Sequence, residues 1–127
     1  MGSKSEKLVF IVDDEENYQI ILSRMLSKYN VITAGDAYEA IIKLGSAKAV
    51  DLLLLDIDMP GMNGIELAQK IKTDFPDITA PIIFVSARSD LESYVEGFEI
   101  GAEDYITKPF EREQVIKLVD EKLNPIN

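Results

Sequence analysis

Short runs of apolar residues alternate along the chain with segments in which apolar residues recur every three or four positions. The runs end at Val12, Ala34, Leu55, Val85 and Ile106, and each has the length of a strand. The segments between them have the spacing of helices with one apolar face. Five strand–helix units in alternation predict a parallel sheet that is covered by helices on both faces.

Strands are predicted at residues 7–12, 31–34, 51–55, 82–85 and 104–106. The first, third and fourth are apolar throughout, which is typical of strands buried on both faces, whereas the second and fifth suit the edges. Right-handed crossovers leave few topologies for such a chain. One common doubly wound order, the flavodoxin-like 2-1-3-4-5, places the first and third strands side by side, and we adopt it as the expected arrangement of a single-domain α/β sheet without deriving it from the pattern.

The helices are predicted from their apolar stripes and end signals. The first has Lys28 in its last turn and a buried stripe of Tyr18, Ile21, Leu22, Met25 and Leu26. The second spans residues 36–44. The fourth is capped by Ser89 or Asp90, ends near Gly101, and turns inward Leu91, Tyr94, Val95 and Phe98. The last begins after Pro109.

Composition limits the possible functions. The 127 residues are 46% hydrophobic and 28% charged, so one domain with a sizeable core is expected over residues 7–124, between a disordered, tag-like segment 1–6 and a tail 125–127. The net charge of -10 argues against direct binding of nucleic acid or anionic membranes. Cysteine and histidine are absent, which excludes thiolate and imidazole chemistry. Without a membrane-spanning stretch or signal peptide, the expected location is the cytoplasm.

Polar residues directly follow the apolar runs. Asp13 and Asp14 follow the first run, Asp56 the third and Ser86 the fourth, and Lys108 comes just after the fifth. Because the carboxyl ends of parallel strands meet at one edge, these groups are expected to converge. Two carboxylates about 4 Å apart repel by roughly 4 kcal/mol at an effective dielectric of 20, so a cation is expected among the three. Mg²⁺ suits such oxygen ligands, and Lys108 adds a second positive charge.

Asp56 is the strongest candidate for a nucleophile, because a carboxylate can accept a phosphoryl group as an acyl phosphate. Such a transfer needs positioning and charge neutralisation rather than a general base. Taken singly, Ser86, Tyr105 and Lys108 also fit plainer roles, as a turn hydroxyl, an edge-strand packing residue and a solvated surface lysine. The bond between Lys108 and Pro109 is trans by base rate.

Four motifs occur in a fixed order. They are Asp13-Asp14, Asp56 with the stretch Met59-Pro60-Gly61-Met62-Asn63-Gly64, Ser86-Ala87, and the segment 101–110, which reads Gly-Ala-Glu-Asp-Tyr-Ile-Thr-Lys-Pro-Phe. This set resembles the receiver domain of response regulators in two-component signalling, of the chemotaxis-regulator kind, over residues 7–123. Each motif is weak alone, but the ordered set is specific.

The resemblance implies a function and a metal site. Asp56 would take a phosphoryl group from a phosphohistidine of a sensor histidine kinase or a histidine phosphotransfer protein. Mg²⁺ would be held by the side chains of Asp13, Asp14 and Asp56 and by the backbone carbonyl of Asp58. Lys108 would contact the phosphoryl group, and a cis bond before Pro109 is implied. The domain would assist only its own phosphorylation and dephosphorylation and would not be an enzyme for external substrates.

The resemblance also implies a switch. Ser86 and Tyr105 would respond to phosphorylation, and the face of the fourth helix, fifth strand and fifth helix would contact an effector or output domain. A homodimer on phosphorylation is a further expectation. Asp58 and Arg88 stand at positions that tune the lifetime of the phosphoryl group in this family, and we expect them to pair over the site.

Three alternatives remain. Asp56-Ile57-Asp58 imitates the nucleophile motif of haloacid-dehalogenase-like phosphatases, although Pro60 departs from that motif and the paired acids come before the nucleophile. A flavin-binding electron carrier of the same fold would need a phosphate-binding loop after the first strand. Residues 13–16, which occupy that place, are all acidic and would repel a phosphate. A degenerate receiver that serves only as a scaffold is the third alternative.

Overall fold

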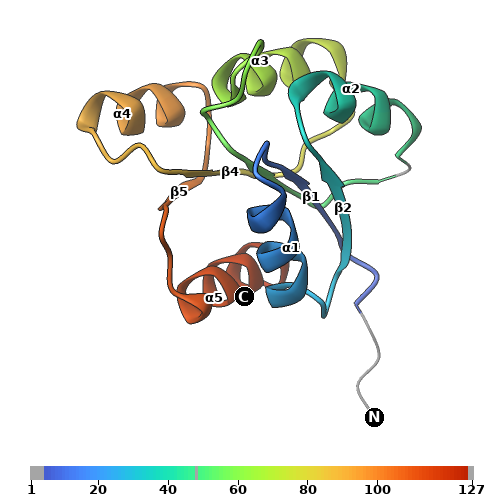
Figure 1. Cartoon of the computed structure of the whole chain (residues 1–127). Coiled ribbons are helices and arrows are strands. Elements are labelled where there is room, and N and C mark those ends of the chain that lie inside the picture. Colours follow the sequence, from blue (N-terminus) through green and yellow to red (C-terminus); the bar gives the residue numbers. More distant parts are fainter. Residues whose placement is uncertain (1–4, 48, 126–127) are drawn as a thin grey trace.

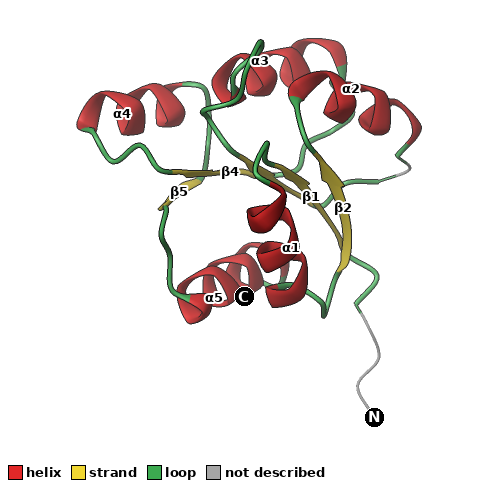
Figure 2. Ribbon diagram, viewed as in Figure 1, coloured by secondary structure: helices red, strands yellow, loops and turns green. Residues whose placement is uncertain are grey.

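The computed structural model describes residues 5–47 and 49–125 and has a five-stranded parallel sheet between two layers of helices (Figures 1 and 2). The strands are β1 (Leu8–Val12), β2 (Asn30–Ala34), β3 (Leu52–Leu55), β4 (Ile82–Ser86) and β5 (Asp104–Thr107). The helices are α1 (Glu16–Met25), α2 (Ala37–Ser46), α3 (Gly64–Asp74), α4 (Leu91–Glu99) and α5 (Arg112–Leu123). The order β2-β1-β3-β4-β5 confirms the predicted topology. Residues 1–4 of the predicted N-terminal segment and residues 126–127 of the predicted tail lie outside the described residues.

Side chains of the strands alternate between two apolar layers. Helices α2, α3 and α4 cover one face of the sheet, and α1 and α5 cover the other (Figure 1). In β1, Phe10 belongs to the first layer and Ile11 to the second, and Leu53 and Leu54 divide in the same way in β3. Strands β1, β3 and β4 are buried on both faces, which confirms their predicted interior positions and explains their uninterrupted apolar runs.

Helix α4 faces the sheet with a side other than the predicted one. The residues predicted to point inward were Leu91, Tyr94, Val95 and Phe98. Leu91, Val95 and Phe98 are exposed, and Tyr94 is partly buried against Tyr105. The buried residues of α4 are Ser93 and Gly97. A Cβ atom on Gly97 would lie 3.1 Å from the Phe84 ring, so the missing side chain allows α4 to approach β4 closely. Periodicity detects an apolar stripe, but it does not say whether the sheet covers that stripe.

Helix α1 is shorter than predicted. It ends at Met25, so Lys28 lies beyond its last turn, where Arg24 is the basic residue. Leu22 and Leu26 are buried against the sheet, whereas Ile21 is 41% exposed, contrary to the prediction. Among the described residues, no helix is both long and apolar enough to cross a bilayer.

Side-chain caps fix the starts of three helices. Asp36 accepts a hydrogen bond from the backbone N–H of Glu39 at α2, and Asp90 accepts one from Ser93 at α4, as one of the two predicted caps. At α3, Asn63 and Glu66 form a reciprocal capping box. Such caps satisfy backbone N–H groups that have no partner within the helix. The box at α3 anchors the far end of the loop that leaves β3.

Candidate functional site

The carboxyl edge of the sheet brings together the acidic residues that follow β1 and β3. Val12 and Leu55 are register partners, so Asp13 and Asp56 leave neighbouring strands at the same level. The N–H of Asp56 donates to the carbonyl of Val12 at 2.9 Å, which continues the sheet to its last position. Carboxylate oxygens of Asp13, Asp14 and Asp56 lie within 4.8 Å of one another. The predicted convergence of the three acids is therefore confirmed.

The ammonium group of Lys108 lies in the same pocket. Its Nζ atom is 2.8 Å from Oδ2 of Asp13, 3.3 Å from Oδ2 of Asp56 and 3.5 Å from Oε2 of Glu15. The side chains of Lys108, Asp13 and Asp56 are at most 5% exposed, so water screens the ion pairs among them weakly, whereas Glu15 is 59% exposed. The peptide bond between Lys108 and Pro109 is cis, as the resemblance implied.

Burial and charge shift the ionisation of this pocket. Burial, followed by the charge of Asp13, raises the pKa of Asp56 to about 7, against the opposing effect of Lys108. Burial alone would lower the pKa of Lys108, but its hydrogen bonds and ion pairs with Asp13 and Asp56 raise it above the ordinary lysine value. The single ammonium of Lys108 does not balance the carboxylates of Asp13, Asp14 and Asp56, so the pocket lacks sufficient positive charge. Clustered carboxylate oxygens with this deficit are typical of a Mg²⁺ site.

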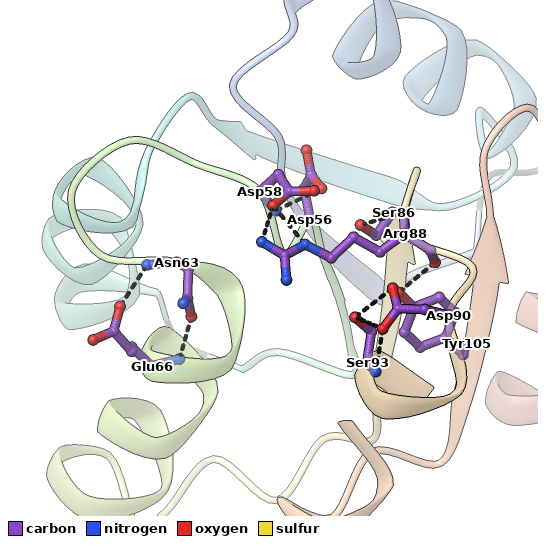
Figure 3. Close-up of polar contacts among 9 residues, drawn as sticks. All are labelled: Asp56, Asp58, Asn63, Glu66, Ser86, Arg88, Asp90, Ser93 and Tyr105. Atoms are coloured by element: carbon purple, nitrogen blue, oxygen red, sulfur yellow. Dashed lines mark hydrogen bonds and ion pairs between the residues drawn. The ribbon is translucent and has the colours of Figure 1, made fainter. Parts of the chain in front are cut away.

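The loop between β3 and α3 is held at both ends beside Asp56. The N–H of Asp58 donates to Oδ1 of Asp56 at 3.2 Å, and the N–H of Gly64 donates to the carbonyl of Ile57 at 2.9 Å. Figure 3 shows the capping box of Asn63 and Glu66 at the far end of the loop. These contacts fix the backbone around Asp58, whose carbonyl the resemblance names as a metal ligand.

Arg88 connects three of the predicted site residues. Its guanidinium reaches from the loop after β4 to Asp58, with Nε at 2.7 Å and Nη2 at 2.6 Å from Oδ1 (Figure 3). Its backbone N–H donates to Oγ of Ser86 at 3.2 Å, and its carbonyl accepts from the hydroxyl of Tyr105 at 2.7 Å. The expected pairing of Asp58 and Arg88 is confirmed as a contact, with both side chains 49% exposed.

Tyr105 is half-buried between β4 and α4. Its ring centroid lies 4.4 Å from that of Tyr94 and 6.4 Å from that of Phe84. The hydroxyl of Tyr94 shares a hydrogen bond of 2.7 Å with Thr107, which precedes Lys108 in the chain. Tyr105 therefore contacts α4 through its ring and the loop after β4 through its hydroxyl.

Sequence reasoning missed two residues beside Lys108. Glu15 directly follows the acid pair and approaches the ammonium, although the sequence indicated only an acidic residue at the start of the first helix, in a loop that repels phosphate. Tyr18 was assigned only to the apolar stripe of the first helix, but its ring centroid lies 4.0 Å from Nζ of Lys108. No local signal marks either contact, because each joins segments at opposite ends of the chain.

Comparison with known proteins identifies the family. The model of the response regulator receiver domain matches residues 9–120. The chain belongs to the response regulator receiver family. It is a phosphoacceptor domain of two-component signalling and not an enzyme that turns over external substrates. Membership removes the basis of the phosphatase and flavin alternatives, which the sequence had left open.

Individual relatives agree with this receiver assignment. The chain is 38% identical over 115 residues to the phosphate regulon transcriptional regulatory protein PhoB of Pseudomonas aeruginosa, covering 88% of this chain and 50% of that protein. It thus spans about half the length of this curated relative, and about a quarter of the DNA-binding transcriptional regulator NtrC of Klebsiella pneumoniae.

Solved structures of receiver proteins superpose closely on this fold. The chemotaxis protein CheY4 of Vibrio cholerae matches with a TM-score of 0.85 at 29% identity, over 94% of this chain and all of that one. The response regulator TrrA of Thermotoga maritima, solved in complex with Mg²⁺ and a beryllium fluoride, matches with a TM-score of 0.78 at 34% identity, over 92% of this chain and 99% of that one.

Proposed function

We propose that Asp56 is the residue of this receiver domain that accepts the phosphoryl group, from a phosphohistidine of a sensor histidine kinase or a histidine phosphotransfer protein. The observation that carries the proposal is the buried carboxylate of Asp56, which lies close to Asp13 and pairs with the ammonium of Lys108. Asp58, the other acid of the Asp56-Ile57-Asp58 motif, pairs with Arg88 instead.

In the transfer, an Oδ atom of Asp56 forms a bond to phosphorus while the bond between phosphorus and the histidine nitrogen breaks. The other ring nitrogen of the reacting phosphohistidine carries a proton, so the nitrogen that keeps the electron pair leaves as part of a neutral imidazole. Lys108 lies where it can contact the oxygens of the phosphoryl group, whose negative charge must be neutralised in the transition state. No general base is needed, because the attacking carboxylate carries no proton.

The metal of this site is proposed to be Mg²⁺, held by the side chains of Asp13, Asp14 and Asp56 and by the backbone carbonyl of Asp58. When bound, it supplies positive charge that favours the ionised form of Asp56 and neutralises phosphoryl oxygens. The clustered carboxylates support this assignment, as does the Mg²⁺ complex of the related TrrA.

Ser86 and Tyr105 are proposed to report the phosphorylated state to the face of α4, β5 and α5. The hydroxyl of Ser86 is buried at the end of β4, and Tyr105 links the loop after β4 to α4. That face would contact an effector or output domain or a second copy of the chain.

We assign the receiver domain to residues 7–124 and its place of action to the cytoplasm.

The test is incubation with phosphoramidate, with and without Mg²⁺, followed by intact-protein mass spectrometry. We expect a gain of one phosphoryl group that requires Mg²⁺ and is absent in Asp56→Ala. Asp58→Asn is the matched control, because it removes the neighbouring acid but keeps the backbone carbonyl, and it should still gain one group. Phosphorylation of Asp56→Ala to the wild-type extent would overturn the proposal.

Arg88→Ala is expected to shorten the lifetime of the phosphorylated form, because the pair of Arg88 and Asp58 lies over the site and restricts the approach of water. Exposed ion pairs contribute about 0.2–1 kcal/mol, so the decay rate should rise by about 1.5- to fivefold. Lys70→Ala is the control, since it breaks a similarly exposed pair with Asp74 on α3. Decay measured by mass after donor removal should be unchanged in the control, and an unchanged rate in Arg88→Ala would contradict the prediction.

A further inference from the structure

The ammonium of Lys108 is attracted by more carboxylates than the proposed reaction uses. Asp13 lies nearer to its Nζ atom than Asp56 does, at 2.8 Å against 3.3 Å, and Glu15 is at 3.5 Å. A lysine carries a compact charge on a flexible four-carbon stem, so charge alone does not hold it at a chosen position. Something other than the carboxylates must limit where the ammonium lies relative to Asp56.

The ring of Tyr18 also contacts this ammonium. Tyr18 belongs to the first turn of α1, and Nζ of Lys108 lies over its ring at 4.0 Å from the centroid. The ring itself packs against Phe110, with centroids 5.7 Å apart and planes at 57°. Phe110 is two residues beyond Lys108, so the aromatic pair joins α1 to the segment that carries the lysine.

A contact with an aromatic face differs from an ion pair in a way that suits this lysine. The face attracts the cation through the ring quadrupole, and the attraction is stronger where water is excluded, as around the buried Lys108 side chain. The ring accepts no conventional hydrogen bond through its face, so the N–H groups of the ammonium remain available to oxygen atoms. The contact can restrain the position of the ammonium without competing for its donors.

We infer that Tyr18 is a positioning residue for phosphoryl transfer, which holds the ammonium of Lys108 over its ring face and so keeps it within reach of a phosphoryl group on Asp56. The inference rests on the proposed role of Asp56 and adds a residue to the machinery of that site. Tyr18 acts through Lys108 and does not itself touch the reacting atoms.

The simpler explanation is that Tyr18 only fills space beside Phe110. The two explanations differ in which substitutions are tolerated. Leucine can pack against Phe110 but has no ring face, whereas phenylalanine keeps the ring face and loses only the hydroxyl. A packing role predicts that Tyr18→Leu is tolerated, and a positioning role predicts that only Tyr18→Phe is tolerated.

The first measurement detects the contact without any reaction. In NMR spectra of the full chain, ring current should shift the ε-methylene protons of Lys108 upfield in the wild-type protein and in Tyr18→Phe. The shift should be lost in Tyr18→Leu, while amide signals of the sheet core stay in place. Equal ε-methylene shifts in all three proteins would overturn the inference.

The second measurement is the rate of phosphorylation by phosphoramidate at saturating Mg²⁺. Loss of a desolvated cation–π contact should lower the maximal rate constant of Tyr18→Leu by about fivefold or more, with Tyr18→Phe restoring most of the rate. Equal rates for wild type and Tyr18→Leu would overturn this inference but not the proposed function. An equal loss of rate in Tyr18→Leu and Tyr18→Phe would have the same consequence. If the wild-type protein took up no phosphoryl group, the proposed function would fail as well.

Discussion

Asp56→Asn is expected to stabilise the protein by about 2–4 kcal/mol at about pH 8 in the absence of divalent cations. The carboxyl group of Asp56 is 5% exposed, and its pKa is raised to about 7 by burial and by the charge of Asp13. Asparagine has a similar shape and no charge, so it removes the cost of an ionised group in this pocket. The residue proposed to do the chemistry is therefore one that opposes folding when no cation is bound.

The stability difference between wild type and Asp56→Asn should depend on pH, because the pKa of Asp56 is higher in the folded than in the unfolded chain. An unfolded aspartate loses its proton near pH 3.9, about three units below the folded value, so the folded chain binds more protons between these limits. The wild-type protein should therefore lose stability as pH rises from about 4 to about 7, and little further above that. Asp56→Asn lacks this loss, so the difference between the two proteins should widen over the same range.

Urea denaturation at a series of pH values, with EDTA present, measures this difference. Asp58→Asn is the control, because its side chain is 49% exposed and its charge is largely solvated. Saturating Mg²⁺ should reduce the difference, since the cation binds the folded wild-type protein more tightly than the variant. A difference between wild type and Asp56→Asn that did not change with pH would contradict the explanation.

Gly64→Ala is expected to destabilise the protein by about 3 kcal/mol or more. A Cβ atom at this position would lie 2.0 Å from the carbonyl oxygen of Asp56 and 3.0 Å from Cα of Ile57. Both are backbone atoms, so a rotamer change cannot relieve the clash. Either the start of α3 or the end of β3 has to move, and the second movement displaces Asp56.

Gly45→Ala is the matched control for this substitution. Gly45 lies in α2 with nothing within 4 Å of a Cβ atom, so alanine should stabilise the protein by about 0.5–1 kcal/mol through its higher helix propensity. The midpoint of urea denaturation should thus fall for Gly64→Ala and rise for Gly45→Ala. Where Gly64→Ala remains folded, its phosphorylation should also be slower. A free energy of unfolding of Gly64→Ala within about 0.5 kcal/mol of the wild-type value would contradict the prediction.

The strand pattern was predictable because burial on both faces leaves a direct mark on the residues. Four consecutive leucines in β3 can belong only to an element that is apolar on every side. The apolar face of α4 was mispredicted for the opposite reason. Its stripe of large residues is real, but the close contact is made by Gly97 against Phe84, and a glycine contributes no signal to a hydrophobic pattern.

The chain by itself determined the alternation of five strands and five helices, and with it the meeting of Asp13, Asp56 and Lys108 at one edge. Residues at the ends of parallel strands converge whatever the details of packing, because the sheet fixes their level. The tertiary structure alone decided some of the contacts within that edge, such as those of Glu15 and the ring of Tyr18 with Lys108. Those contacts depend on rotamers and on the distance between elements remote in the chain, which no local pattern of residues records.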